Sequence, residues 1–335
     1  MPLQKALAYR AAIPELNQAA TNAFRLVDGT GDGWPGVEID TYNGHWVVQT
    51  RDLPFPENQL HHLPAGCRSL WWKPLDRKDK QAPACLQGEP PAGPFSVQEL
   101  GLNYEIDLTA GYSQGLFLDQ RLQRQRMMQR IQPGQRVLNL FAYTCAFSVA
   151  AASSGAITTS VDLSQPYLDW GRRNFQLNKI DPDSHFFCRG DTLEWLRRFA
   201  KKGRLWDGIV VDPPTFSRNA EGRVFRVEQD FPGLIHLCLA VLSPGGWILA
   251  STNHRGLSPA QFRQLLEQGA TAAQRPLHRL EPGQMPPDFT GEPYLKSYWL
   301  EAWTPARESA PATGSHPSGT TTTPAPSPPQ TPKNG

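Results

Sequence analysis

Strand-like and helix-length segments alternate through the second half of this 335-residue chain. Short apolar runs occur at residues 136–141, 157–162, 185–191, 208–212 and 247–252, and a segment long enough for an amphipathic helix separates each from the next. Such alternation predicts βαβ units whose strands form one parallel sheet with helices on both faces. The expected fold class is therefore α/β with a doubly wound sheet, and a ligand is expected beyond the carboxyl ends of the strands.

Two helix starts in this region are marked by their residues. Ser164 precedes QPYLDWGRRNFQLN, and Ser258-Pro259-Ala260-Gln261 fits a capping box with proline at the first helical position. A last strand pattern, at residues 294–303, follows a loop rich in Pro and Gly and need not be parallel to the others.

The remaining chain divides into three parts. Residues 1–22 predict an N-terminal helical segment broken near Pro14, and residues 23–108 predict a small β-rich domain with hairpins at Asn43-Gly44 and residues 95–108 and a strand at residues 68–73. The α/β domain then spans residues 109–305. Residues 306–335 have almost no apolar content, which predicts a disordered tail.

Composition excludes several classes of protein. The chain is 39% hydrophobic, has no apolar run long enough to span a bilayer and starts without a secretory pattern, so we expect no membrane contact and a cytoplasmic location. Its five cysteines are widely spaced, which argues against disulfides and against a cysteine zinc site. DGTGDG at residues 28–33 is similar to a calcium loop but is interpreted as a turn, so no metal is expected. A net charge of +2 is too small to indicate nucleic-acid binding, so such a function must be argued from local clusters of basic residues.

Acidic residues close three successive strand patterns: Asp162, Asp191 and Asp212. A carboxylate at the second strand can accept both hydroxyls of a ribose, and one at the next strand can accept from an adenine amino group. Each residue alone could instead be a helix N-cap, which suits Asp191 before Thr192. Three in order favour a nucleoside site, because like charges at one edge are costly without a ligand.

The turn that follows the strand pattern at residues 136–141 restricts the class of ligand. NLFAYTCAF at residues 139–147 has no glycine, whereas a dinucleotide site uses GxGxxG so that pyrophosphate can approach a helix N-terminus. A ligand with ribose and adenine but no phosphates is preferred. S-adenosylmethionine fits, with its sulfonium end positioned by the turn backbone and by Tyr143 and Thr144.

Specific motifs then carry a family resemblance. They are GLFLDQR at 115–121, VLNLFAYT at 137–144, SVDLS at 160–164, NFQLN at 174–178, VVDPPTFS at 210–217 and STNHRG at 251–256. Over residues 111–303 the chain resembles the bacterial class I methyltransferases that modify large-subunit ribosomal RNA. NAFRLVDGTGDGWPGVEIDTY at 22–42 resembles the start of the small central domain of their cytosine-C5 branch (methyltransferase I), although that branch's N-terminal PUA-like domain is not visible.

The resemblance implies a Rossmann-like, seven-stranded sheet with an antiparallel last strand, and S-adenosylmethionine as cofactor. The implied cofactor residues are Phe117, Asp119, Arg121, Asn139, Phe141, Tyr143, Thr144, Asp162, Leu163, Asp191, Thr192 and Asp212. The implied catalytic residues are Asp212, Pro213, Pro214 and Phe216, the last of which can stack on an extruded base. Cys145 departs from the family, which usually has glycine there; a left-handed backbone would cost this residue about 1 kcal/mol. SQG at 113–115 also departs from a KTG-like triplet.

Ribosomal RNA is the expected partner. A basic rim would contact its phosphates, formed by Arg124, Arg218, Arg223, Arg226, His254 and Arg255. The four arginines between residues 121 and 130 are either a solvated helix face or phosphate contacts.

The methylated atom is inferred from the nucleophile. Methylation at C5 of a pyrimidine needs a cysteine thiolate, yet this chain reads STNHRG where the cytosine branch has its cysteine, and Cys188 and Cys238 fall in predicted core segments. We therefore expect methylation of a base nitrogen, as in the guanine-N7 domain of the fused K/L enzymes. Cytosine-C5 methylation and a catalytically weakened RNA-binding protein of the same fold are the alternatives.

Overall fold

The computed structural model describes residues 2–17, 20–60, 62–75, 82–111, 113–214, 216–218 and 224–303. Contacts within the chain join residues 1–304 into one compact unit. The predicted domain boundary near residue 108 stays a prediction, and the predicted disordered tail lies outside the described residues. None of the helices in the described ranges is long and apolar enough to cross a membrane.

The N-terminal part contains a five-stranded sheet. Its strands follow chain order: β1 (Ala23–Asp28), β2 (Val37–Tyr42), β3 (His45–Thr50), β4 (Ser69–Pro74) and β5 (Ala84–Gly88). All neighbouring strands are antiparallel except β3 and β4, which are parallel. The short helices of this part are α1 (Pro2–Ala11), α2 (Pro14–Asn17), η1 (Gly29–Asp32) and α3 (Glu57–Leu60).

Turn chemistry explains the hairpins of this part. Asn43 and Gly44, which join β2 to β3, have φ of 51° and 82°, and both residue types tolerate this left-handed backbone. Strands β6 (Phe95–Glu99) and β7 (Leu102–Ile106) form a second antiparallel hairpin. Both predicted hairpins, the strand near residues 68–73 and the helix break near Pro14 are confirmed.

The second half forms a seven-stranded sheet in the order β10-β9-β8-β11-β14-β16-β15. The strands are β8 (Arg136–Leu140), β9 (Ile157–Asp162), β10 (Phe186–Arg189), β11 (Trp206–Val211), β14 (Leu242–Thr252), β15 (Leu277–Pro282) and β16 (Lys296–Ala302). The first five strands of this order are parallel, and β16 is antiparallel to both of its neighbours. The predicted α/β class, the seven strands and the antiparallel last strand are confirmed; β15 was not predicted.

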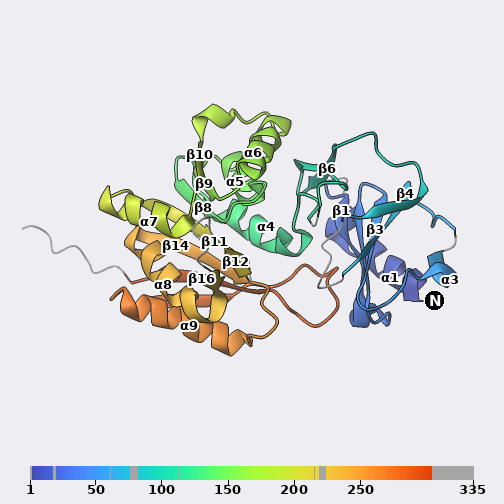
Figure 1. The fold of residues 1–335 in the computed structure, drawn as a ribbon. Coiled ribbons are helices and arrows are strands. Elements are labelled where there is room, and N and C mark those ends of the chain that lie inside the picture. Colours follow the sequence, from blue (N-terminus) through green and yellow to red (C-terminus); the bar gives the residue numbers. More distant parts are fainter. Residues whose placement is uncertain are drawn as a thin grey trace, which may run out of the picture. The chain divides into compact units, whose positions relative to one another are not determined.

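Helices cover both faces of this sheet (Figure 1). One layer packs apolar side chains of α4 (Arg121–Arg130), α5 (Ala146–Ser153) and α6 (Gln165–Leu177). The other layer consists of α7 (Thr192–Lys201), α8 (Val227–Ala240) and α9 (Pro259–Ala272), whose buried side chains share one cluster with β11, β14 and β16. The other elements are η2 (Leu118–Gln120), η3 (Pro182–Ser184), β12 (Phe216–Arg218) and β13 (Val224–Arg226).

The predicted helix starts are confirmed by their hydrogen bonds. Ser164 Oγ accepts from Tyr167 N at the start of α6, and Ser258 with Gln261 makes both bonds of a capping box at α9. These local signals fix where α6 and α9 begin, on opposite faces of the sheet.

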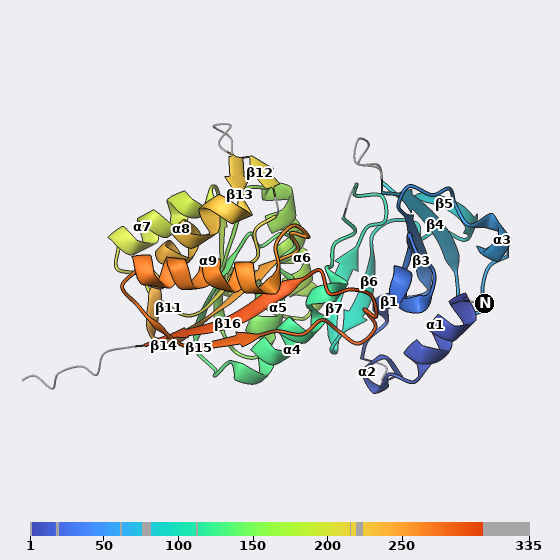
Figure 2. The same cartoon turned by 90° about the horizontal axis from the view of Figure 1, so that it is seen from below.

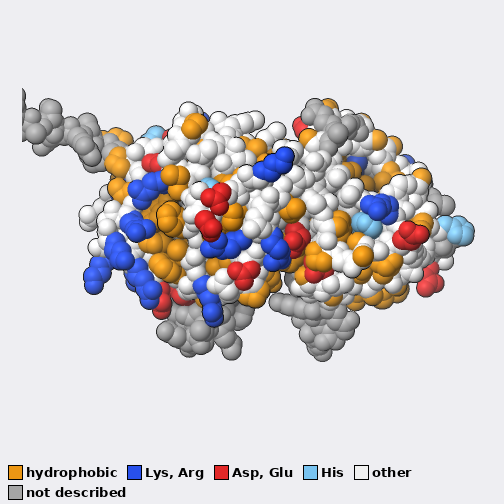
Figure 3. Space-filling view, turned by 90° about the horizontal axis from the view of Figure 1, so that it is seen from above, with side chains coloured by type: hydrophobic (Ala, Val, Ile, Leu, Met, Phe, Trp, Pro, Cys, Tyr) orange, Lys and Arg blue, Asp and Glu red, His pale blue; other side chains and the backbone are white. Residues whose placement is uncertain are grey.

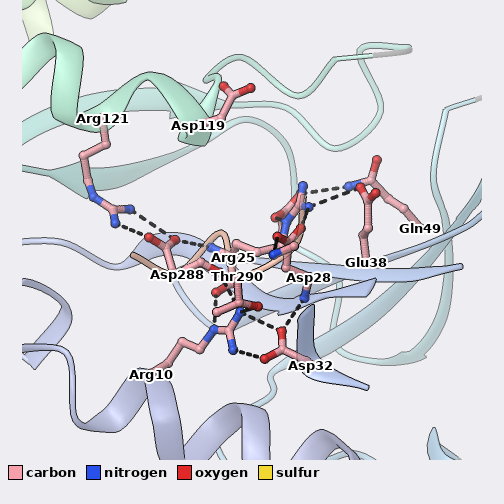
Figure 4. A network of polar contacts seen from close by, with 12 residues as sticks. Arg10, Arg25, Asp28, Asp32, Glu38, Gln49, Asp119, Arg121, Asp288 and Thr290 are labelled. Atoms are coloured by element: carbon pink, nitrogen blue, oxygen red, sulfur yellow. Dashed lines mark hydrogen bonds and ion pairs between the residues drawn. The ribbon is translucent and has the colours of Figure 1, made fainter. Parts of the chain in front are cut away.

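The segment between β15 and β16, residues 283–295, is called the strap here. Figure 2 shows it reaching to the neighbourhood of β1 and α2. Its Asp288 is fully buried and accepts from Arg25 N at 2.9 Å and from the Arg121 guanidinium, while its carbonyl oxygen accepts from Arg10. Figure 4 shows these side chains converging from α1, β1, α4 and the strap. Polar contacts therefore hold the strap between the two sheets.

Candidate active site

The turn after β8 has an unusual backbone. Phe141, Tyr143 and Cys145 have φ of 57°, 48° and 62°, a left-handed conformation that side chains rarely adopt. Cys145 N donates to Ala142 O, and Cys145 is the N-cap of α5. Strained backbone of this kind is concentrated at ligand sites, where the surrounding structure maintains it. The left-handed conformation suspected at Cys145 is confirmed.

Gly171 on α6 makes room for the Cys145 side chain. A Cβ at Gly171 would lie 2.8 Å from the Cβ of Cys145 and closer still to its Sγ. Cys145 is fully buried, and burial raises the pKa of its thiol to about 12. The substituted turn is thus accommodated by a glycine on the neighbouring helix, and its thiol stays protonated.

Asp162 connects this turn to the start of α6. Its Oδ2 accepts from Tyr143 N at 2.8 Å, and its Oδ1 accepts from Ser164 N at 2.9 Å. Burial raises the pKa of Asp162 although both backbone bonds oppose the shift. A carboxylate at this strand end can accept further hydrogen bonds, which is the geometry expected for a ribose site.

Asp191 acts as the N-cap of α7. Its Oδ1 accepts from Leu193 N at 2.9 Å and from Glu194 N at 3.1 Å, while Thr192 is buried behind it. The capping role that suited this residue from sequence is therefore present. Its contact with adenine stays a prediction, as do those of Leu163 and Thr192.

A third carboxylate, Asp212, follows β11 and forms an acidic cluster with Asp119. Asp212 Oδ2 accepts from Gln120 Nε2 at 2.9 Å, and Asp119 Oδ2 accepts from the Tyr294 hydroxyl at 2.9 Å. Burial and the nearby Asp119 carboxylate raise the pKa of Asp212 to about 7. Burial also raises the pKa of Asp119.

Two buried acceptors of this group lack a partner. Within the described residues, Asp119 Oδ1 and Gln120 Oε1 have no hydrogen bond, although Asp119 is 9% exposed and Gln120 only 2%. Such atoms lose several kcal/mol in an apolar environment unless a donor satisfies them. S-adenosylmethionine carries an ammonium donor and a sulfonium cation, so the donor-poor, carboxylate-rich site fits this cofactor.

Aromatic side chains surround the turn. The Tyr143 ring lies 5.3 Å from Phe117 and 4.6 Å from Tyr167, and its hydroxyl donates to Ser113 O. Phe117 is 45% exposed, whereas Phe141 packs toward Phe225. Phe117 and Tyr143 are thus able to contact a ligand above the turn.

Three predicted cofactor residues have buried side chains that bond within the fold, and their contacts with the cofactor stay predictions. The Asn139 amide is buried and donates to Ser148, and the buried Thr144 hydroxyl donates to Gly115 O at 2.6 Å, so these side chains support the turn from within. Arg121 is 1% exposed and bonded to Asp288; Figure 4 shows Arg121 and Asp119 pointing in different directions. Neighbours on a short helix face different sides, which motif spacing alone does not reveal.

The residues of the predicted RNA-binding rim differ in exposure. Arg124 is 1% exposed, pairs with Glu99 through two bonds and donates to Phe117 O, so its side chain serves the fold and its contact with RNA stays a prediction. Arg226 and Arg255 are exposed, and Arg255 lies 4.7 Å from the Tyr294 ring.

The remaining site residues are placed in part. His254 pairs with Glu228 at 2.7 Å, Pro213 is buried and Pro214 exposed. The backbone of Phe216 and Arg218 lies in β12, but their side chains, like Arg223 as a whole, lie outside the described residues.

Sequence reasoning missed two residues of the site, Gln120 and Tyr294. Gln120 lies inside the GLFLDQR motif but was given no role, and the bond to Asp212 spans 92 residues. Tyr294 belongs to the strap, which has no strand or helix period. The glutamine was visible as a polar residue between two motif positions, whereas only the fold brings Tyr294 to Asp119.

A doubly wound sheet with a glycine-free, strained turn and carboxylates at its carboxyl edge defines a nucleoside-cofactor protein of the class I methyltransferase type. The sequence profile of the S-adenosylmethionine-dependent methyltransferases matches residues 25–294. The chain belongs to that family.

Individual relatives agree with the family. The chain is 33% identical to YwbD of Bacillus subtilis over 86% of its length and 74% of that protein. It is 30% identical to ribosomal RNA large subunit methyltransferase I of Cronobacter sakazakii (83% of this chain, 72% of that protein). It is 43% identical over 162 residues to ribosomal RNA large subunit methyltransferase K/L of Hahella chejuensis (48% of this chain, 22% of that protein).

A solved structure supplies the cofactor comparison. The crystal structure of SMU.776 complexed with SAH superposes with a TM-score of 0.79 at 30% identity, covering 89% of this chain and 80% of that chain. The fold class, the methyltransferase activity and the cofactor S-adenosylmethionine are thereby established for this chain at the level of its family.

Proposed function

We propose that this protein methylates a base nitrogen of large-subunit ribosomal RNA, with guanine N7 as the favoured atom. Its relatives from Cronobacter sakazakii and Hahella chejuensis are named ribosomal RNA large subunit methyltransferases. Sequence identity is 43% over 162 residues of the K/L protein and 30% over 289 residues of methyltransferase I, so the likeness to K/L is stronger but confined to a shorter stretch. The preference for nitrogen agrees with the resemblance of DPPTFS and NHRG to the guanine-N7 domain of the K/L enzymes.

The state of the cysteines is the observation that carries the choice of nitrogen. Methylation at C5 needs a thiolate to add to the pyrimidine ring. All five thiols of the chain have a raised pKa because of burial: Cys67, Cys85, Cys145, Cys188 and Cys238. Cys145 and Cys238 are fully buried, Cys188 lies in the edge strand β10, and Cys67 and Cys85 belong to the N-terminal part of the chain. This placement supports attack by a base nitrogen with its own lone pair.

The acidic group suits the charge movement of this reaction. When bound, S-adenosylmethionine supplies an activated methyl group and a positive charge on sulfur. As guanine N7 forms its bond to the methyl carbon, the carbon–sulfur bond breaks, its electron pair stays on sulfur and the positive charge appears on the purine. Carboxylates at Asp212 and Asp119 would stabilise that charge, and a low-dielectric site strengthens the effect.

The proposal assigns a role to each part of the site. The backbone of the turn at Tyr143, with Asp162 beside it, would bind the nucleoside part of the cofactor, and Phe117 would cover it. Asp212 with Pro213 and Pro214 would face the base. Phe216 is proposed to stack on the extruded base.

Methylation of protein-free large-subunit ribosomal RNA tests the proposal, with labelled cofactor and mass spectrometry of the digested RNA. We expect 7-methylguanosine, with a loss of at least about 100-fold in Asp212→Asn, in keeping with the loss of one charge-stabilising group. Asp169→Asn, an exposed helix residue bonded to Gln165, is the matched control and should retain activity. Appearance of 5-methylcytidine would establish the alternative, and no methyl transfer to ribosomal RNA would refute the substrate.

A further inference from the structure

Two sets of basic side chains stand out among the residues that the structure describes. One group pairs with carboxylates: Arg10, Arg25, Arg121, Arg124, Arg126, Arg130, Arg172, Arg173, Arg263 and Arg279. These arginines are explained by the fold. They include all four arginines of α4, for which the sequence left open a solvated helix face or phosphate contacts.

The second group lies on and around α7. It consists of Arg189, Arg197, Lys201, Lys202 and Arg204, and is called the α7 ridge here. All five are exposed, and within the described residues no hydrogen bond or ion pair of their side chains is found. Arg198 lies among them, in a loose pair with Glu194 at 3.7 Å.

The ridge is unfavourable for the isolated helix. Arg197 and Lys201 are four residues apart, as are Arg198 and Lys202, and like charges at this spacing destabilise a helix by about 0.2–0.5 kcal/mol per pair. The helix dipole favours cations in the last turn, which accounts for Lys201 and Lys202. It accounts neither for Arg197 nor for Arg189, which is not in the helix.

Packing holds the ridge in place. Leu196 and Phe199 are buried on the opposite face of α7, and Trp195 Nε1 donates to Arg189 O at 3.1 Å. Arg189 is paired in register with Asp162 of β9, so the ridge begins beside the candidate cofactor site. From there α7 extends over about 15 Å, given ten residues at 1.5 Å each.

Figure 3 shows Lys and Arg side chains gathered on one side of the face it displays, over α7. Exposed large hydrophobic side chains flank the ridge at Phe186 and Leu205, and none is exposed among the residues between them. Protein interfaces need an apolar or aromatic centre, whereas a phosphate backbone needs only cations. The chemistry of this surface therefore favours a polyanion over a protein partner.

We propose that the α7 ridge binds the sugar–phosphate backbone of the substrate RNA as it leaves the active site. This inference rests on the proposed function and extends it, since it assigns the RNA path to a surface outside the family motifs. Arg189 would contact the backbone beside the cofactor site, and the other cations would contact phosphates farther along the strand.

Neutralising the ridge tests the proposal. The variant Arg197→Gln/Lys201→Gln/Lys202→Gln/Arg204→Gln removes four charges that no described contact uses and keeps residues that form helices well. The matched control, Lys5→Gln/Lys179→Gln/Arg263→Gln/Arg279→Gln, removes four exposed charges elsewhere. Binding of protein-free large-subunit ribosomal RNA is measured against salt concentration, with titration of S-adenosylmethionine and thermal unfolding to verify both variants.

We expect the ridge variant to bind RNA at least about tenfold more weakly at moderate salt, and its salt slope to fall by up to about 3, since each phosphate contact contributes 0.7–0.9. Its KM for RNA should rise while kcat at saturating RNA and cofactor affinity stay unchanged. The control should change by less than twofold.

Equal behaviour of the two variants would overturn the inference, because only net charge would then matter. Failure of the wild-type protein to methylate ribosomal RNA would refute the proposed function instead. In that case the dependence of RNA affinity on salt concentration still tests whether the α7 ridge binds RNA, since binding is measured without turnover.

Discussion

Gln120 is the residue on which the ionisation of Asp212 depends. Its amide donates to Asp212 Oδ2, and this bond lowers the pKa of Asp212 against burial and the Asp119 charge. Removing the donor in Gln120→Met should raise that pKa above about 7. Because the charge-stabilising form is the carboxylate, the acid limb of the pH–rate profile should move to higher pH. A rise of about one unit in the pKa would lower the ionised fraction at pH 7 from about a half to about a tenth.

Gln123 of α4, three residues after Gln120, provides the matched control. It is also buried, and it bonds to Gln284 O and Trp299 rather than to an acid. Gln123→Met should lower stability without moving the pH profile. A profile that stays in place in Gln120→Met as well would show that Asp212 is not the group that titrates.

Cys145 and Gly171 form a second pair at the scale of residues. Gly171→Ala should destabilise the protein by about 2 kcal/mol, because the new methyl group overlaps the Cys145 side chain. In the Cys145→Gly variant, the additional change Gly171→Ala should leave the free energy of unfolding nearly unchanged. A double-mutant cycle measured by urea unfolding gives the coupling; additive free energies would mean that α6 moves away instead.

At the scale of elements, α4 is anchored through Arg124. Its guanidinium makes two bonds to Glu99 of β6, and both side chains are at most 1% exposed. Arg124→Met alone should lower the free energy of unfolding by about 3–5 kcal/mol, since it leaves a buried carboxylate unpaired. Arg124→Met/Glu99→Met should recover most of that loss.

RNA binding distinguishes the two roles considered for this arginine. If Arg124 is structural, the folded double variant should bind large-subunit ribosomal RNA as tightly as the wild type does. If the double variant binds RNA more weakly and its affinity depends less on salt, the predicted contact of Arg124 with a phosphate would be supported.

At the scale of the whole molecule, the strap and a shared core connect the two sheets. Ala23, Tyr42, Val47 and Trp71 of the first sheet belong to the same buried cluster as Leu168 and Phe175 of α6. Asp288 adds polar contacts with Arg10, Arg25 and Arg121. The protein should therefore unfold as one unit.

Asp288→Ala tests this coupling. It leaves the buried Arg121 without its carboxylate, so stability should fall by about 3–5 kcal/mol, while the apolar cluster keeps unfolding in a single calorimetric transition. Asp183→Ala, which removes an exposed partner of Arg172, should be nearly neutral. Two transitions in Asp288→Ala would favour independent domains divided near residue 108.

The positions of the helices and strands and the class of site could be predicted from the amino-acid sequence alone. Local chemistry was sufficient there: Asn43-Gly44 permits a tight hairpin, Ser164 and Ser258 satisfy free helix N–H groups, and apolar runs of strand length require burial on both faces. The missing glycines of NLFAYTCAF and the ordered aspartates indicated a phosphate-free nucleoside ligand, in agreement with the family.

Only the tertiary structure decided which charged side chains are available. The arginines between residues 121 and 130 recur among glutamines, a pattern typical of an exposed helix face. Arg121 and Arg124 are nevertheless buried, because they pair with carboxylates 167 and 25 residues away in the chain. The Gln120–Asp212 and Tyr294–Asp119 bonds span 92 and 175 residues, and the room for Cys145 comes from another helix. Local patterns determine backbone conformation, whereas burial and pairing of charge depend on which distant segments the fold brings together.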